Sequence, residues 1–370
     1  MKMKRTRSYM VVGIIFLSLS ITFLTSAVFL AKSVIAQSPT ALPARLTFST
    51  LSVGTVFHVT GSGLAKVATG HTPIQVVVSP MASARSWVYQ MDKSGTPELG
   101  IMQMSEIWQA YSGKLAPKPE PIPGDPRKGP PYSPACPGLR ILIAGTHLRA
   151  SFLVRNDSPM KTMADMRGKR MTWGFPAFPP NIEWGLAGLS AAKMTVNDVV
   201  PMPVTEVVSG VRALMDGRVD IAIGAVGMPI VAEADASIGV RFLPEPMDPE
   251  SIKRHQAVMS GSTIRPVHPG IPGIKTETPV GHVPIVIQAS THMPEDAAYA
   301  LVKAWWDHYK ELEPIHPQFR GWVPDVYVTK LTTIPYHPGA IKFYKEKGVW
   351  TDEYNKMQER LLKGEILLLD

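Results

Sequence analysis

Residues Arg45–Val78 read RLTFSTLSVGTVFHVTGSGLAKVATGHTPIQVVV and contain two strand patterns around one helix pattern. Arg45–Ser49 reads as a strand, Val56–Ala68 as the helix that follows it, and Ile74–Val78 as a second, β-branched strand. A strand, a helix and a further strand in this order are the unit from which parallel sheets covered by helices are built. The pattern therefore predicts an α/β fold.

The same alternation continues along the chain. We expect further strands at 99–102, 139–144, 151–155, 170–173 and 282–290, and a turn that leads into a strand at 216–224. We expect further helices at 82–91, 105–111, 162–167 and 205–216, and one that begins at Pro294. The helix at 205–216 should place one apolar stripe on a sheet: Val207, Val208, Val211, Leu214 and Met215. With 370 residues, the chain should form two domain-sized units with mainly parallel sheets.

A proline-rich segment interrupts this pattern between Gly113 and Gly138. It contains nine prolines, at positions 117, 119, 121, 123, 126, 130, 131, 134 and 137. Proline donates no backbone N–H and breaks helices and central strands. We interpret the segment as an extended excursion on the surface, with recognition by a partner as the less favoured alternative.

The first 36 residues explain most of the positive charge of the chain. The formal net charge of +8 and the pI of about 9.4 raise the question of nucleic acid, but five basic residues and no acidic ones lie in this segment. Without the segment the net charge falls to +3. A basic start, an apolar run over Met10–Leu30 and the small residues before Gln37 are typical of a signal peptide. We therefore predict an extracytoplasmic protein that binds no nucleic acid, with an uncleaved membrane anchor as the less favoured alternative.

Cysteine and histidine usage argues against metal and cofactor chemistry. The single cysteine, Cys136, can form neither an internal disulfide nor a thiolate zinc site, and its distance from the cleavage point excludes a bacterial lipid anchor. None of the ten histidines has a second histidine at the i, i+4 spacing of a shared ligand face. There is no nucleophile elbow, phosphate loop or dinucleotide fingerprint. We expect no metal, no cofactor and no enzyme activity.

Candidate ligand contacts follow the predicted strands of the first half. In α/β sheets, ligands bind beyond the carboxyl ends of the strands, where helix N-termini attract anions. The loop 49–55 supplies hydroxyls and a glycine that could hold a carboxylate, although an ordinary capped turn is an equal alternative. An arginine after the second strand could bind a carboxylate with two hydrogen bonds. The candidates in this half are Thr50, Ser52, Gly54, Thr55, Ser83, Arg85 and Gln103.

Five sequence blocks, in this order, resemble one family of receptors. The most specific is Ile334–Gly348, which reads IPYHPGAIKFYKEKG. The other four are Glu98–Gln103, Ser158–Arg170, Leu214–Ala222 and Ile264–Gly270. Together they resemble the TAXI family, the extracytoplasmic solute receptors of TRAP transporters, over nearly all of the chain after the signal peptide.

The resemblance implies a type II periplasmic-binding-protein fold, in which two α/β lobes close over a ligand. The first lobe would span 37–150, the second 151–265, and the chain would return over 266–370 to the first lobe and the C-terminal helices. Such a receptor captures a small organic anion and delivers it to a multispanning membrane permease without breaking a bond. Two alternatives stay open: the receptor of an ABC importer for sulfonates, nitrate or pyrimidine precursors, and a sensory ligand-binding module.

Two loops depart from the family pattern. The loop after the first strand has one glycine, and Phe57 is the one aromatic residue of the expected two. The turn 174–180 of the second lobe carries three prolines, so fewer backbone N–H groups can hold a carboxylate. Aromatic residues stand there instead, which indicates a bulkier or more apolar acid, or simply core packing. The candidates in this lobe are Trp173, Phe175, Phe178, Asn181 and Gly227.

Overall fold

The computed structural model describes residues 42–365, except 52, 54, 82, 116–124, 126, 128, 130 and 176–179. The predicted signal peptide, 1–36, lies outside the described residues. Within the described part of the chain, every helix is too short or too polar to cross a membrane.

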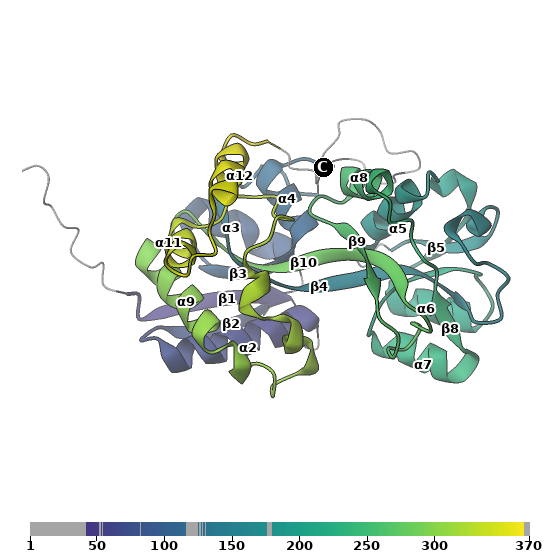
Figure 1. Ribbon diagram of the computed structural model, residues 1–370, viewed down its shortest axis with the longest axis horizontal. Coiled ribbons are helices and arrows are strands. Elements are labelled where there is room, and N and C mark those ends of the chain that lie inside the picture. Colours follow the sequence, from purple (N-terminus) through teal and green to yellow (C-terminus); the bar gives the residue numbers. More distant parts are fainter. Residues whose placement is uncertain are drawn as a thin grey trace, which may run out of the picture. The chain divides into compact units, whose positions relative to one another are not determined.

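One mixed sheet of eight strands forms the centre of the protein (Figure 1). Its strand order is β2-β1-β3-β10-β4-β7, with β8 paired to β4 and β9 paired to β10, and a separate two-stranded sheet pairs β5 with β6. The strands are β1 Arg45–Leu51, β2 Gln75–Met81, β3 Leu99–Gln103, β4 Leu139–Arg155, β5 Arg170–Gly174, β6 Val200–Val204, β7 Ala222–Ala225, β8 Val240–Phe242, β9 Thr263–Val267 and β10 Thr278–Ser290.

The two long strands, β4 and β10, join two lobes. The antiparallel pair runs from Ala150 opposite Gly281 to Leu139 opposite Ser290. The second half of β10 pairs with β3, whereas its first half pairs with β9, and the end of β4 pairs with β7 and β8. We call the part around β1, β2 and β3 the first lobe and the part around β5 to β9 the second lobe. The expected boundaries at residues 150 and 265 stay a prediction.

Two expectations about the strands were wrong. We expected separate strands at 139–144 and 151–155, but β4 is continuous, because residues 147–150 pair with β10 although they lack an alternating apolar pattern. We also expected mainly parallel sheets. Parallel pairing joins β1 to β2, β1 to β3 and β5 to β6, but β10 runs antiparallel to β3, β4 and β9 because the chain returns through it from the second lobe.

Helices cover both lobes. Those of the first lobe are α2 Val56–His71, α3 Val88–Ser94, α4 Met104–Ser112, α9 Glu295–Asp307, α10 Pro324–Tyr327, α11 Pro338–Glu346 and α12 Asp352–Leu362. Those of the second are α5 Pro180–Ala191, α6 Val207–Met215, α7 Pro229–Ile238 and α8 Pro249–Val258. The helix expected at 82–91 is broken into the 3₁₀ turn η1, Ala84–Ser86, and α3, and the one expected at 162–167 is the 3₁₀ turn η2, Met163–Met166.

The apolar stripe expected on α6 is confirmed. Val211 and Leu214 are fully buried, and Val207, Val208 and Met215 are partly buried against the same cluster. That cluster fills the second lobe between α6, α7 and the sheet. A larger core extends over the first lobe and under α5. The packing leaves the ends of the strands near the lobe junction as the place for polar side chains.

The described part of the proline-rich segment keeps several residues exposed and is anchored to the protein by two buried side chains. Tyr132 and Cys136 are buried, and the Tyr132 hydroxyl donates to Glu106 at 2.7 Å. Burial, with a smaller effect of Asp92, raises the pKa of the Cys136 thiol to about 12. The thiol is therefore uncharged and unreactive at neutral pH.

Candidate ligand-binding site

The carboxyl ends of the strands from both lobes converge on β10. Gln103, at the end of β3, pairs with Ile285, and Ala225, at the end of β7, pairs with Ala150, which is opposite Gly281. Projected onto β10, the two ends are four residues apart, or about 13 Å at the rise of an extended strand, and three strand spacings of about 5 Å separate β3 from β7 across the sheet. Loops that leave strands at such a junction are where α/β proteins bind ligands.

The predicted contacts after β1 lie at this junction, but several are engaged in the loop itself. Thr50 is buried; its hydroxyl donates to the carbonyl of Leu51 at 3.0 Å and lies 3.1 Å from His58 Nδ1. The Thr55 hydroxyl caps α2 by accepting the His58 N–H at 3.1 Å. Phe57 is buried in the first-lobe core. Ser52 and Gly54 lie outside the described residues.

The predicted contacts after β2 form the start of η1. The Ser83 hydroxyl accepts the Arg85 N–H at 3.3 Å. Arg85 is exposed, and its guanidinium lies 5.7 Å from the centre of the Tyr132 ring. Burial raises the pKa of Glu106, while the Tyr132 hydrogen bond and the charge of Arg85 lower it. Arg85 therefore already acts on a carboxylate of this chain.

The aromatic residues predicted in the second lobe are packed inside it. Trp173 and Phe175 belong to the core, and Trp173 packs where a side chain at Gly185 would otherwise be. Phe175 has a φ of 42°, a left-handed conformation that costs a bulky residue energy and that concentrates at functional turns. Phe178 lies outside the described residues.

Asn181 and Gly227 have the properties expected of ligand contacts. Asn181 is the second residue of α5 and is 5% exposed, and its amide Nδ2 has no hydrogen-bond partner among the described residues. A buried amide without a partner costs about 1–3 kcal/mol, which a bound polar group would relieve. Gly227 follows β7 with a φ of 86°, and no described atom lies within 4 Å of the position that a Cβ would take. A ligand can approach the backbone there.

A buried carboxylate that the sequence analysis missed joins the two lobes. Glu183, on α5, accepts hydrogen bonds from Ser105 and Gln109 of α4 and from Arg127 at 2.8 Å. The Ser105 hydroxyl in turn accepts from the predicted contact Gln103 at 3.1 Å. Gln103 is therefore part of a network that crosses the lobe junction.

Burial has the largest effect on the pKa of Glu183. The charge of Arg127 lowers this pKa and that of Glu106 raises it, and the pKa rises to about 7. Arg127 is also bound to Asp125 at 2.7 Å, so its charge is shared between two carboxylates. The network can lose or gain a proton near neutral pH.

Four further side chains lie together on the strands that cross the junction. His282 of β10 is opposite Arg149 of β4 and Thr263 of β9. His147 is two residues from Arg149, and Arg265 is two residues from Thr263. Because side chains alternate along a strand, His147, Arg149, Arg265 and His282 share one face, which we call the arginine face. The sequence feature that corresponds to this face is the i, i+2 spacing of His147 and Arg149 along one strand.

A pocket of about 360 Å³ opens at the carboxyl ends of β5 and β6. It is lined by Gly174, Pro203, Val204, Thr205, Ser209 and Arg218. The predicted turn at 174 therefore borders open space as well as core.

A serine, a histidine and a glutamate meet in the second lobe, but not in an arrangement for nucleophilic catalysis. Ser262 Oγ lies 2.6 Å from His255 Nδ1, and His255 Nε2 lies 3.7 Å from Glu245 Oε2. All three are buried, and the Ser262 hydroxyl donates to the Met259 carbonyl at 2.6 Å. Burial raises the pKa of Glu245 to about 7 and lowers that of His255 to about 3. A nucleophile must also be reachable by its substrate, whereas the Ser262 hydroxyl is fully buried in this structure.

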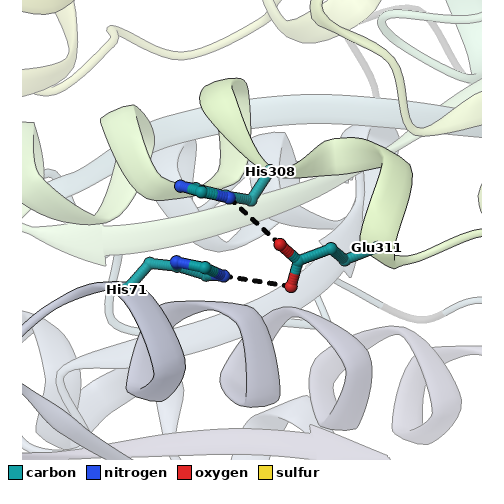
Figure 2. A group of neighbouring side chains, drawn as sticks. All are labelled: His71, His308 and Glu311. Carbon is teal, nitrogen blue, oxygen red and sulfur yellow. Dashed lines mark hydrogen bonds and ion pairs between the residues drawn. The ribbon is translucent and has the colours of Figure 1, made fainter.

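His71, His308 and Glu311 meet from distant parts of the sequence (Figure 2). The two imidazoles stack with centroids 3.4 Å apart and planes inclined by 10°. His71 Nε2 lies 3.0 Å and His308 Nδ1 3.1 Å from the Glu311 carboxylate. The potential ligand atoms lie within 4.8 Å of one another, but the parallel rings direct their nitrogens side by side rather than towards one point. We interpret the cluster as a link between the ends of α2 and α9, and the absence of a metal stays a prediction.

The NMT1-like family matches residues 130–348, more than half of the chain. The chain belongs to this family. The NMT1-like protein is similar to a TctC solute binding protein from Polaromonas, with 13% identity, a TM-score of 0.50 and coverage of 76% of this chain and 88% of that one. It is also similar to the periplasmic aliphatic sulphonate binding protein SsuA from Escherichia coli, with 14% identity, a TM-score of 0.44 and coverage of 88% and 97%. It is similar as well to MatC from Rhodopseudomonas palustris with bound malate, with 13% identity, a TM-score of 0.47 and coverage of 87% of this chain and 99% of that one.

The likeness to the TctC protein confirms the expected fold. The NMT1-like protein has the two-lobed α/β fold of periplasmic solute-binding proteins. The narrower resemblance to the TAXI family stays a prediction.

Proposed function

We propose that the protein is an extracytoplasmic receptor that captures a small organic anion between its two lobes and delivers it to a membrane permease. The observation that carries this proposal is that the carboxyl ends of β3 and β7 point towards each other across β10 and β4, with a register difference of four residues along β10. Loops from both lobes can therefore contact one small molecule at the strands that join them.

The expected ligand carries negative charge. Apart from the predicted signal peptide, the chain has a formal net charge of +3, and α2, α5 and α7 begin at loops that follow strand ends near the junction. Helix N-termini favour anions. The proposed ligand is a carboxylate.

The type of permease is proposed from the sequence alone. The five blocks that end with Ile334–Gly348 favour a TRAP-type permease, and the receptor of an ABC importer or a sensory module is the alternative. Genes for a multispanning permease next to this one would support the TRAP assignment, an ATPase gene would support an importer, and a kinase or cyclase gene would support a sensor.

A thermal-shift screen tests the proposed function. The purified protein would be melted with malate, adipate, glutamate, benzoate, short sulfonates, neutral sugars and amines. A ligand at a hundred times its dissociation constant should stabilise the protein by about 2.7 kcal/mol, so the melting temperature should rise clearly with carboxylates. Stabilisation by sugars or amines alone would contradict the proposal.

Replacement of Asn181 by leucine should separate binding from stability. The variant removes a buried amide without a described partner, so the melting temperature without ligand should be unchanged or higher. Affinity for the acid found in the screen should fall about tenfold or more, because the hydrogen bond to the ligand is lost. Titration calorimetry measures this, with the exposed Asn197→Leu as the matched control. Equal affinities of the Asn181 variant and the wild type would remove Asn181 from the site.

A further inference from the structure

The arginine face joins three strands at the lobe junction. Register places Arg149 and His282 directly opposite each other, with His147 opposite Pro284 on one side of this pair and Arg265 opposite Val280 on the other. The rings of His147 and His282 meet edge to face, with centroids 5.6 Å apart. The four side chains therefore form one contiguous polar surface rather than four separate positions.

The two arginines of this face lack a carboxylate partner among the described residues. Other arginines of the second lobe have one: Arg155 pairs with Asp157 and Arg170 with Asp220. Arg149 is half-buried, and burial alone lowers its pKa, with no acidic group to offset the effect. A partly desolvated guanidinium without a counter-ion is unfavourable by itself and favours an anion from outside.

The two histidines add hydrogen-bonding groups without adding charge. Burial, Arg265 and Arg149 lower the pKa of His147 to about 4, and burial, His147 and the same arginines lower that of His282 to about 3. Both rings are therefore neutral at pH 7. His282 is 9% exposed, and its Nε2 has no partner among the described residues. This nitrogen is available to a ligand that reaches the arginines.

The face lies where the proposed ligand would bind. The carbonyl of Arg149 accepts the N–H of Val226 at 2.9 Å, and Val226 precedes the exposed turn at Gly227. The end of β3, at Gln103, pairs with β10 three residues beyond His282. Arg265 is exposed, so the face is open to a small molecule.

We propose that the arginine face is the carboxylate-binding floor of the ligand site, with Arg149 as the principal contact and Arg265 and His282 as supporting contacts. The planar guanidinium of Arg149 would hold the two oxygens of one carboxylate. This assigns the charged end of the ligand to the strands that join the lobes, so that the loops select the remainder of the molecule. The inference rests on the proposed function.

The test compares Arg149→Gln with the wild type. The acid that shifts the melting temperature most among malate, adipate, glutamate and benzoate would be titrated into both proteins by calorimetry. Loss of a charged hydrogen-bond pair should weaken binding about 10- to 100-fold. The neutral glutamine removes a desolvated charge, so the variant should melt no lower than the wild type without ligand. Arg149→Lys should recover part of the affinity, since it keeps the charge but loses the two-point geometry.

The matched control is Arg155→Gln, on the same strand but in an exposed ion pair with Asp157. It should change affinity less than about twofold. If the wild type binds a carboxylate and Arg149→Gln binds it within threefold as well, the assignment of the arginine face is wrong and the proposed function stands. If no carboxylate stabilises the wild type, the proposed function fails and the assignment fails with it.

Discussion

Replacing Gly339 by alanine should destabilise the protein by about 3 kcal/mol. Gly339 is the second residue of α11, and a Cβ there would overlap the carbonyl oxygen of Glu295 and lie 2.9 Å from the Cβ of Ala298, both on α9. The overlap is with backbone, so α9 and α11 must move apart for a methyl group to fit. Overpacking in a tight interior costs about 1–3 kcal/mol, and the larger value applies where no flexible side chain can yield. Urea unfolding followed by circular dichroism measures the change.

Gly70→Ala is the matched control for this substitution. Gly70 lies in α2, and no described atom outside its own helix backbone and chain neighbours lies within 4 Å of the position that its Cβ would take. Alanine is favoured over glycine in a helix, so this variant should be as stable as the wild type or more stable by up to about 1 kcal/mol. A loss of less than about 1 kcal/mol for Gly339→Ala would show that the two helices separate easily.

This packing explains why the block Ile334–Gly348 is so specific. His337 Nδ1 accepts the Gly339 N–H at 3.1 Å and caps α11, and its other ring nitrogen lies 3.1 Å from the Met293 carbonyl just before α9. Pro338 begins the helix, where its missing N–H costs nothing. His337, Pro338 and Gly339 thus hold α11 against α9, so these three residues of the block that resembles the TAXI family have a structural role.

The fold was predictable to the extent that it depends on local patterns. The strand–helix–strand pattern of Arg45–Val78 and the apolar stripe of α6 are local, and both are present in the structure. The continuity of β4 between Ala144 and Ser151 was not predictable from pattern, because residues 147–150 are held by pairing with β10, more than 130 residues away in the sequence. The antiparallel return of β10 depends on the same long-range pairing.

The candidate site was predictable in position but not in its charged members. Gln103, Asn181 and Gly227 follow strands, and rules about strand ends find such residues. Glu183 lies in helix α5 and Arg149 in strand β4. A single charged residue in such an element is usually exposed to solvent, so the sequence does not single it out. Residues from other elements form their environment. Glu183 accepts a hydrogen bond from Gln109, 74 residues away, and Arg149 on β4 lies opposite His282 on the neighbouring strand β10.

Relative to the wild type, Glu183→Gln should gain about 3 kcal/mol in its free energy of unfolding between pH 5 and pH 8.5. The folded pKa of about 7 lies above the ordinary value of 4.5, so the folded protein holds the proton more tightly than the unfolded chain. The stability that Glu183 contributes is complete below about pH 4.5 and is lost as the pH rises through about 7. Glutamine resembles the protonated acid and has no such loss. Urea unfolding of both proteins at the two pH values measures the difference.

The comparison of two pH values isolates the titration of Glu183 from any fixed effect of the amide on Ser105 and Gln109. Glu233→Gln, which removes an exposed carboxylate paired with Arg212, is the control and should change stability by less than about 0.5 kcal/mol at either pH. If the difference between Glu183→Gln and the wild type is the same at pH 5 and pH 8.5, Arg127 keeps Glu183 ionised throughout, and the two residues form a permanent ion pair. If the difference follows the pH as expected, the contact between the lobes weakens when Glu183 loses its proton, because the carboxylate is then a buried charge that Arg127, shared with Asp125, neutralises only in part.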